Sequence, residues 1–148
     1  MLPIHIPPWQ SVYWWFRRLT RGLMFRTIHD VALMIDRARS GSAPEPSAAV
    51  IDSQSVKAPA PGATRGFDGA KKIVGRERHM AVDTDGRLLL VNPTPANMAD
   101  SAGAQAVLDI LHERWRWVEH LFADSAYDVI AQPPSGEALW RGSVGQIF

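Results

Sequence analysis

The chain contains no cysteine, no long hydrophobic run and no large excess of charge of one sign. The lack of cysteine excludes disulfides, thiolate zinc sites and cysteine nucleophiles, and it suits a reducing compartment. The longest apolar runs, residues 12–16 and 88–91, are far shorter than the roughly 18 residues that span a bilayer, and residues 1–10 lack the layout of a signal peptide. We therefore expect a cytoplasmic protein with no membrane partner.

The composition predicts a globular protein whose positive charge is concentrated in one segment. Of the 148 residues, 46% are hydrophobic and 21% are charged, and the net charge is only +1. Between Arg65 and His79, however, five lysines and arginines accompany two acids, which gives this segment a net charge of +3. Such a segment indicates contact with an anionic partner, or alternatively a charged hairpin that simply faces solvent.

Residues 1–44 are predicted to form a small helical segment. A helix from Trp9 to about Arg21 follows two prolines, and a second helix follows Gly22 with an apolar stripe at Met24, Ile28, Val31 and Ile35. Arg37 falls on its solvent side. The aromatic cluster of residues 9–16 could stack on nucleic-acid bases, but its helical spacing favours hydrophobic packing. Residues 40–47, rich in serine and proline, indicate a linker and a boundary near residue 45.

After this boundary the pattern predicts an α/β layout. Residues 48–51 form a short apolar run that ends at Asp52, and residues 118–123 form another that ends at Asp124. Between them, residues 57–69 contain too many prolines and glycines for a regular element, and Asp85-Gly86 indicates a hairpin of residues 78–83 and 87–91. A helix over residues 99–114, with Asp100 as its N-cap, would return the chain so that the two strands that end in aspartate lie parallel.

Two aspartates at the ends of neighbouring parallel strands can share a pair of divalent cations, and such a pair can clamp the attacking and leaving oxygens of a phosphodiester displacement. Ligation by oxygen alone favours Mg²⁺ or Mn²⁺. Each aspartate taken alone could equally be a turn former or a helix cap. His79 could serve as a ligand or a proton shuttle, but a lone histidine at a strand start is more often packed or hydrogen-bonded.

The motifs around these aspartates resemble those of bacterial insertion-sequence DDE transposases. The matching segments are IDSQSVK at 51–57, RGFD at 65–68, KK at 71–72, GRERH at 75–79, VDT at 82–84, Ala96-Asn97 with Asp100, and ADSAY at 123–127. Upstream, PPWQSVY at 7–13 and WFRR at 15–18 resemble the helical segment that precedes the catalytic core in the same group. The resemblance covers about residues 2–127.

The resemblance implies an incomplete ribonuclease H-like mixed sheet, preceded by a partial DNA-binding-associated segment, that cuts DNA at element ends and joins the freed 3′-hydroxyl to target DNA. Asp52 would be the first ligand of Mg²⁺ or Mn²⁺ and Asp124 the second. Residues 45–128 would form the partial core and residues 129–148 an atypical tail. The basic residues expected to contact the DNA backbone are Lys57, Arg65, Lys71, Lys72, Arg76 and Arg78.

The sequence departs from the family pattern after Asp124. The family's third acid is a glutamate on a later helix, and Glu137, the only glutamate after Asp124, is too close to Asp124 to follow another helix and strand. We therefore expect a copy truncated at both ends, with an uncovered sheet edge and without catalytic activity. The alternatives are a non-catalytic DNA-binding module, which could form homo-oligomers or associate with intact transposase, and an inert gene remnant.

Overall fold

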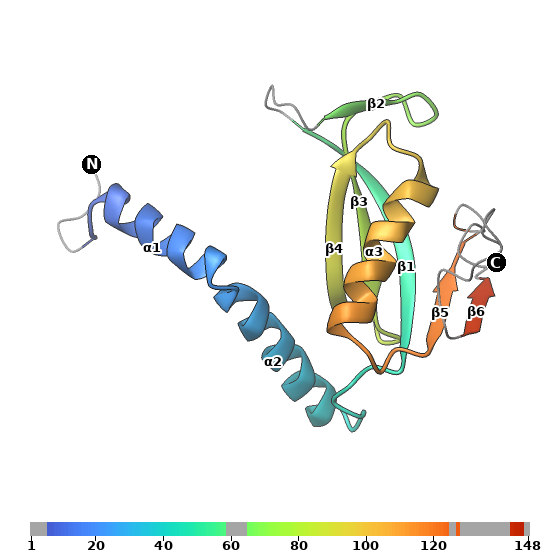
Figure 1. Ribbon diagram of the computed structural model, residues 1–148, viewed down its shortest axis with the longest axis horizontal. Coiled ribbons are helices and arrows are strands. Elements are labelled where there is room, and N and C mark those ends of the chain that lie inside the picture. Colours follow the sequence, from blue (N-terminus) through green and yellow to red (C-terminus); the bar gives the residue numbers. More distant parts are fainter. Residues whose placement is uncertain (1–5, 59–64, 125–126, 128–142, 147–148) are drawn as a thin grey trace. The chain divides into compact units, whose positions relative to one another are not determined.

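The computed structural model describes residues 6–58, 65–124, 127 and 143–146. The chain divides into two compact units, Met1–Pro44 and Glu45–Phe148. The first unit contains two helices, and the second contains a six-stranded sheet with one helix (Figure 1). Within the described ranges, no helix is long and apolar enough to cross a membrane.

The two predicted helices of the first unit are confirmed. Helix α1 (Trp9–Arg21) begins directly after Pro8, and helix α2 (Met24–Arg39) begins after a tight turn at Gly22 and Leu23. Leu23 adopts a left-handed backbone conformation with φ of 56°. The rings of Phe16 and Phe25, one from each helix, lie 5.9 Å apart and connect the two elements across this turn.

The apolar side chains of these helices are largely exposed, and the prediction that Arg37 faces solvent was wrong. No side chain of α1 is buried, and its aromatic rings are about half exposed, so they contact mainly one another and neighbouring arginines. The apolar stripe of α2 is also exposed, whereas Leu33 and Arg37 are buried. Arg37 Nε–H donates a hydrogen bond to the carbonyl of Ala43 at 2.8 Å, which offsets the cost of burying this group. Periodicity identifies an apolar stripe, but it does not show whether another element covers that stripe.

The second unit is an α/β structure with a mixed sheet, as predicted. Its strands are β1 (Ala48–Lys57), β2 (Gly66–Asp68), β3 (Ile73–Val82), β4 (Leu88–Pro95), β5 (His120–Ala123) and β6 (Ser143–Gln146). The order is β2-β3-β1-β5-β6, and β4 pairs with β3. Strand β3 is antiparallel to its three partners, whereas β5 is parallel to β1 and β6. This sheet is compatible with an incomplete ribonuclease H-like core.

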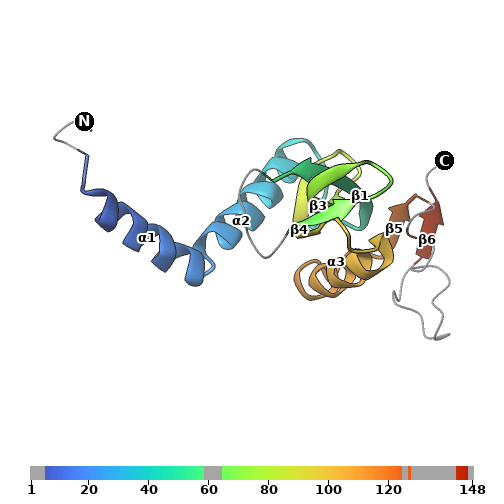
Figure 2. The ribbon, with the colours of Figure 1, turned by 90° about the horizontal axis from the view of Figure 1, so that it is seen from above.

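Helix α3 (Asp100–Arg114) covers one face of the sheet, where it contacts β3 and β4 (Figure 2). The predicted helix is confirmed, and its apolar residues at helical spacing are all buried, namely Ala104, Val107, Leu108 and Leu111. The helix starts at Asp100 with Ala99 as its N-cap, so the predicted capping position was one residue too late. At its end, buried Trp115 donates from Nε1 to the carbonyl of Leu89 at 3.3 Å, which fixes the helix to β4.

The predicted hairpin is confirmed, and three strand features were not predicted. Strand β1 continues six residues past Ile51, because β3 pairs with it as far as Lys57. A short strand, β2, interrupts the stretch that was expected to be irregular. A further strand, β6, pairs with the outer edge of β5. The extension of β1 and the strand β6 depend on partners that are distant in sequence, which local pattern does not reveal, whereas β2 pairs with the nearby start of β3.

Candidate active site

The sheet brings Asp52 and Asp124 together at neighbouring backbone positions. The last pair of the parallel β1–β5 ladder is Ile51 with Ala123, and each aspartate is the next residue of its chain segment. Since neighbouring strands lie about 4.8 Å apart, the paired residues Ile51 and Ala123 are about 5 Å from each other, and the two aspartates directly follow them. Both side chains are exposed. The expectation that β1 ends at Asp52 was wrong, because Asp52 is inside the strand and pairs with Met80 of β3.

Asp52 belongs to the sheet face that α3 does not cover. Side chains alternate between the two faces of a strand, and Ile51, directly before Asp52, is buried on the side of α3. Gly103 of α3 lies against the ring of His79, because a Cβ added at Gly103 would be 2.1 Å from that ring. His79 and Ala81 point to the same face of β3, and Ala81 is paired with Ile51, so α3 covers the face to which Ile51 points. Asp52 is therefore on the opposite, open face of the sheet, and its side chain is exposed there.

The pair offers two adjacent carboxylates at an exposed position, and this donor set fits a hard divalent cation such as Mg²⁺ or Mn²⁺. The backbone N–H of Ser53 donates to Asp52 Oδ1 at 2.7 Å, which orients that carboxylate. Within the described part of the chain, no group of three histidines or acids is close enough to hold a metal ion.

Two of the predicted basic residues share the open face with Asp52. Arg78 pairs with Gln54 and Arg76 pairs with Val56 in the β1–β3 register, and residues paired in this way project to the same side of the sheet. Since Gln54 and Val56 follow Asp52 at intervals of two residues, all of these side chains lie on one face. Arg76 and Arg78 are both exposed. A phosphate backbone that reaches the aspartates could contact both guanidinium groups.

Lys71 has a different environment from these arginines. Its ammonium group lies 2.8 Å from Oε1 of Glu77, whose side chain is only 4% exposed, and 3.9 Å from Oδ2 of Asp68. Burial raises the pKa of Glu77, but the hydrogen bond and the positive charge of Lys71 outweigh burial and hold this pKa below its usual value. The pKa of Asp68 is also lowered, chiefly by the hydrogen bond that its carboxylate accepts from the backbone N–H of Lys71. Lys71 therefore already compensates a buried carboxylate.

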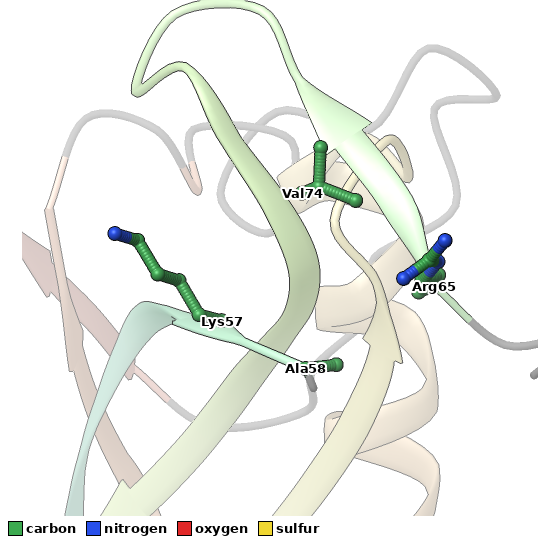
Figure 3. A pocket seen from close by; sticks show the side chains of 4 residues that line it. All are labelled: Lys57, Ala58, Arg65 and Val74. Atoms are coloured by element: carbon green, nitrogen blue, oxygen red, sulfur yellow. The ribbon is translucent and has the colours of Figure 1, made fainter. Parts of the chain in front are cut away.

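The other predicted DNA contacts lie away from the aspartate pair along the sheet. Lys57 ends β1 and Arg65 precedes β2, and with Ala58 and Val74 they line an open hollow of about 620 Å³ (Figure 3). Lys72 is exposed in the turn before β3 and has a left-handed backbone with φ of 54°. The six predicted basic residues therefore fall into three groups. Arg76 and Arg78 lie on the open face, Lys71 pairs with a buried carboxylate, and Lys57, Arg65 and Lys72 lie near one end of the sheet.

His79 forms a buried polar cluster with two residues that the sequence analysis did not single out. Its ring is fully buried, with Nδ1 at 3.1 Å from the hydroxyl of Tyr127 and Nε2 at 3.1 Å from Oγ1 of Thr94. The preference for a packed, hydrogen-bonded histidine is confirmed. Tyr127 was present in the ADSAY motif, but no local pattern could connect it with a histidine 48 residues earlier.

A family model described as the transposase DDE domain matches residues 43–133, more than half of the chain. The matched range includes both aspartates, all six predicted basic residues and the strands from β1 to β5. No curated protein and no solved structure matches the chain. The chain belongs to the transposase DDE domain family, whose function is DNA transposition.

Proposed function

We propose that Asp52 and Asp124 are the first two metal ligands of a DDE transposase centre that cleaves and joins DNA. The observation that carries this proposal is the parallel β1–β5 register, which places the two aspartates side by side with exposed carboxylates. Bound Mg²⁺ or Mn²⁺ would activate a water or a 3′-hydroxyl and stabilise the charge that develops at phosphorus. The aspartates hold and orient the ions.

The arginines of β3 would position the DNA. Arg78 and Arg76 share the open face with Asp52 and lie one and two side-chain positions further along the sheet, respectively. Cations in such a row neutralise successive phosphates without reading bases, which fixes the scissile bond relative to the metal pair. We do not include Lys71 among these contacts, because its ammonium group is paired with Glu77.

Catalysis needs a further ligand. Two carboxylates leave a two-metal centre short of negative charge, and the described residues supply no third member of the group. We propose that this chain by itself binds metal and DNA but cleaves DNA poorly or not at all. Glu137, which lies outside the described residues, and an associated intact transposase are the candidate sources of the missing acid.

Metal binding is the first test of the site. Calorimetric titration of the full chain with Mn²⁺ should show binding that weakens about 10-fold or more when either ligand is changed, as Asp52→Asn or Asp124→Asn. Asp109→Asn is the matched control, because Asp109 is exposed on α3 and bonds only locally to Gln105 at 2.8 Å. Equal Mn²⁺ affinity in all four proteins would refute the proposed metal site.

DNA binding and cleavage separate the enzyme from a second candidate, a DNA-binding module without catalysis, which the open-face arginines favour. Replacing both Arg76 and Arg78 by glutamine should reduce the slope of log DNA affinity against log salt concentration by about two, one for each lost phosphate contact. Replacing Arg116, an exposed control, by glutamine should leave this slope unchanged. Mn²⁺-dependent nicking that Asp52→Asn abolishes would establish catalysis. DNA binding without any nicking fits both the module and an incomplete metal centre, and the two are then separated by Mn²⁺ binding that Asp52→Asn weakens, which the module alone does not predict.

A further inference from the structure

We propose that His79 and Tyr127 position Asp124 for metal binding, which rests on the proposed function of the aspartate pair. Asp124 lies beyond the last backbone pairs of β5, since the ladders with β1 and with β6 both end at Ala123. The contacts of the residues that follow Ala123 therefore influence how Asp124 is oriented. An anchor further along the chain can hold such a ligand in place.

Tyr127 provides this anchor. Its backbone N–H donates to the carbonyl of Asp124 at 3.1 Å, which closes a turn directly after β5. Its side chain is only 2% exposed and its hydroxyl lies 3.1 Å from Nδ1 of His79. The two rings meet edge to face, with centroids 6.3 Å apart and an interplanar angle of 86°. The turn that carries Asp124 is thus attached to the centre of strand β3.

His79 is rigidly held on its other side. Nε2 lies 3.1 Å from Oγ1 of Thr94 on β4, and the backbone of α3 approaches the ring at Gly103, where a Cβ would lie 2.1 Å from Nε2. A neutral imidazole has one donor and one acceptor nitrogen, and each hydroxyl partner can take either role. Both ring nitrogens are therefore satisfied without charge. Because three elements hold the ring in place, its hydrogen bond restricts the movement of Tyr127.

The backbone register also places His79 close to the other ligand. His79 pairs with Ser53, the residue after Asp52, on the β1–β3 ladder. The imidazole thus lies on the inner face of the sheet while Asp52 projects from the outer face one position away. One buried ring therefore connects the strand that fixes Asp52 with the turn that fixes Asp124, and this connection sets the spacing of the two carboxylates.

Two matched variants test this role. Tyr127→Phe removes the hydroxyl that bonds Nδ1 of His79, whereas Thr94→Val removes the hydroxyl on the opposite side of the same ring. Each variant deletes one buried hydrogen bond, so both should lower the melting temperature by similar amounts while keeping a cooperative transition. Only Tyr127→Phe should lower Mn²⁺ affinity, by about 10-fold, as expected for a residue that supports a metal ligand.

Hydrogen exchange gives a readout that does not depend on metal. The amide of residue 127, which bonds to the Asp124 carbonyl, should exchange about 10-fold faster in Tyr127→Phe and at the wild-type rate in Thr94→Val. Equal effects of the two variants on Mn²⁺ affinity and on this amide would overturn the positioning role. If the wild-type chain binds no Mn²⁺, the proposed metal site is wrong, but the exchange result still decides whether Tyr127 anchors the turn.

Discussion

Lys71→Met should destabilise the second unit, because it leaves the buried carboxylate of Glu77 without its cation. At the observed separation of 2.8 Å, two unit charges interact by about 6 kcal/mol at an effective dielectric constant of 20 and about 1.5 kcal/mol in water. The side chain of Glu77 is 4% exposed, but that of Lys71 is 45% exposed, so solvent screens much of this energy. We expect a loss of about 1–2 kcal/mol at pH 7, between the values typical of exposed and buried pairs.

The pH dependence of this loss identifies its cause. Since the pKa of folded Glu77 lies below the reference value of 4.5, the pair contributes stability above that pH and loses it as the pH falls through the lower folded pKa. Urea unfolding of the full chain, followed by circular dichroism between pH 3 and 8, should therefore show wild type and Lys71→Met converging in acid. Near neutrality the melting temperature should differ by about 5–10 °C.

Lys72→Met is the control for this experiment. It removes the same charge from the adjacent residue, which is exposed and for which the structure shows no salt bridge among the described residues. We expect its effect on the unfolding free energy to stay within about 0.5 kcal/mol. Equal losses in the two variants, or a Lys71→Met loss that is unchanged at acid pH, would refute the assignment of Lys71 to Glu77.

Three substitutions test the packing that supports the site, each by thermal unfolding. Gly75→Ala should cost more than about 3 kcal/mol, because a Cβ there would lie 1.9 Å from the backbone oxygen of Val56, which cannot move without breaking the β1–β3 ladder. Leu111→Ala should cost about 2–5 kcal/mol, because Leu111 is fully buried between α3 and the sheet. Asp83→Ala should cost about 2–3 kcal/mol, since this buried carboxylate accepts two backbone N–H groups of the hairpin, whereas exposed Thr84→Ala should change little.

The elements that bring the aspartates together were predictable because their signals are local. Apolar runs identified the start of β1 and the end of β5, Asp85-Gly86 identified the hairpin, and the spacing of buried residues identified α3. From the order strand, hairpin, helix, strand, a parallel return follows, since a helix must cross the sheet before the chain can run in the same direction again. The juxtaposition of Asp52 with Asp124 follows from the same reasoning.

The rest of the site depends on contacts that residue spacing does not reveal. The sequence shows Lys71 as one of several cations, and only the fold places its ammonium, in the turn before β3, against the buried carboxylate of Glu77 within that strand. Likewise, Tyr127 meets His79 because β5 returns beside β1 while β3 occupies the other side of β1. Strand β6 pairs with β5 although its own residues carry no clear strand pattern. Residue type shows which interactions a side chain can form, but only the fold shows which partner it contacts.

The two aspartates therefore differ in how they are held, and this difference bears on the chemistry. Asp52 lies within a strand that is paired with β3, so its backbone moves only if the sheet moves. Asp124 follows the last pair of β5 and depends on a turn closed by Tyr127. The position of Asp124 thus depends on the contacts of Tyr127 as well as on the sheet. Changes at Tyr127 and its partners should therefore alter metal affinity more readily than changes around Asp52.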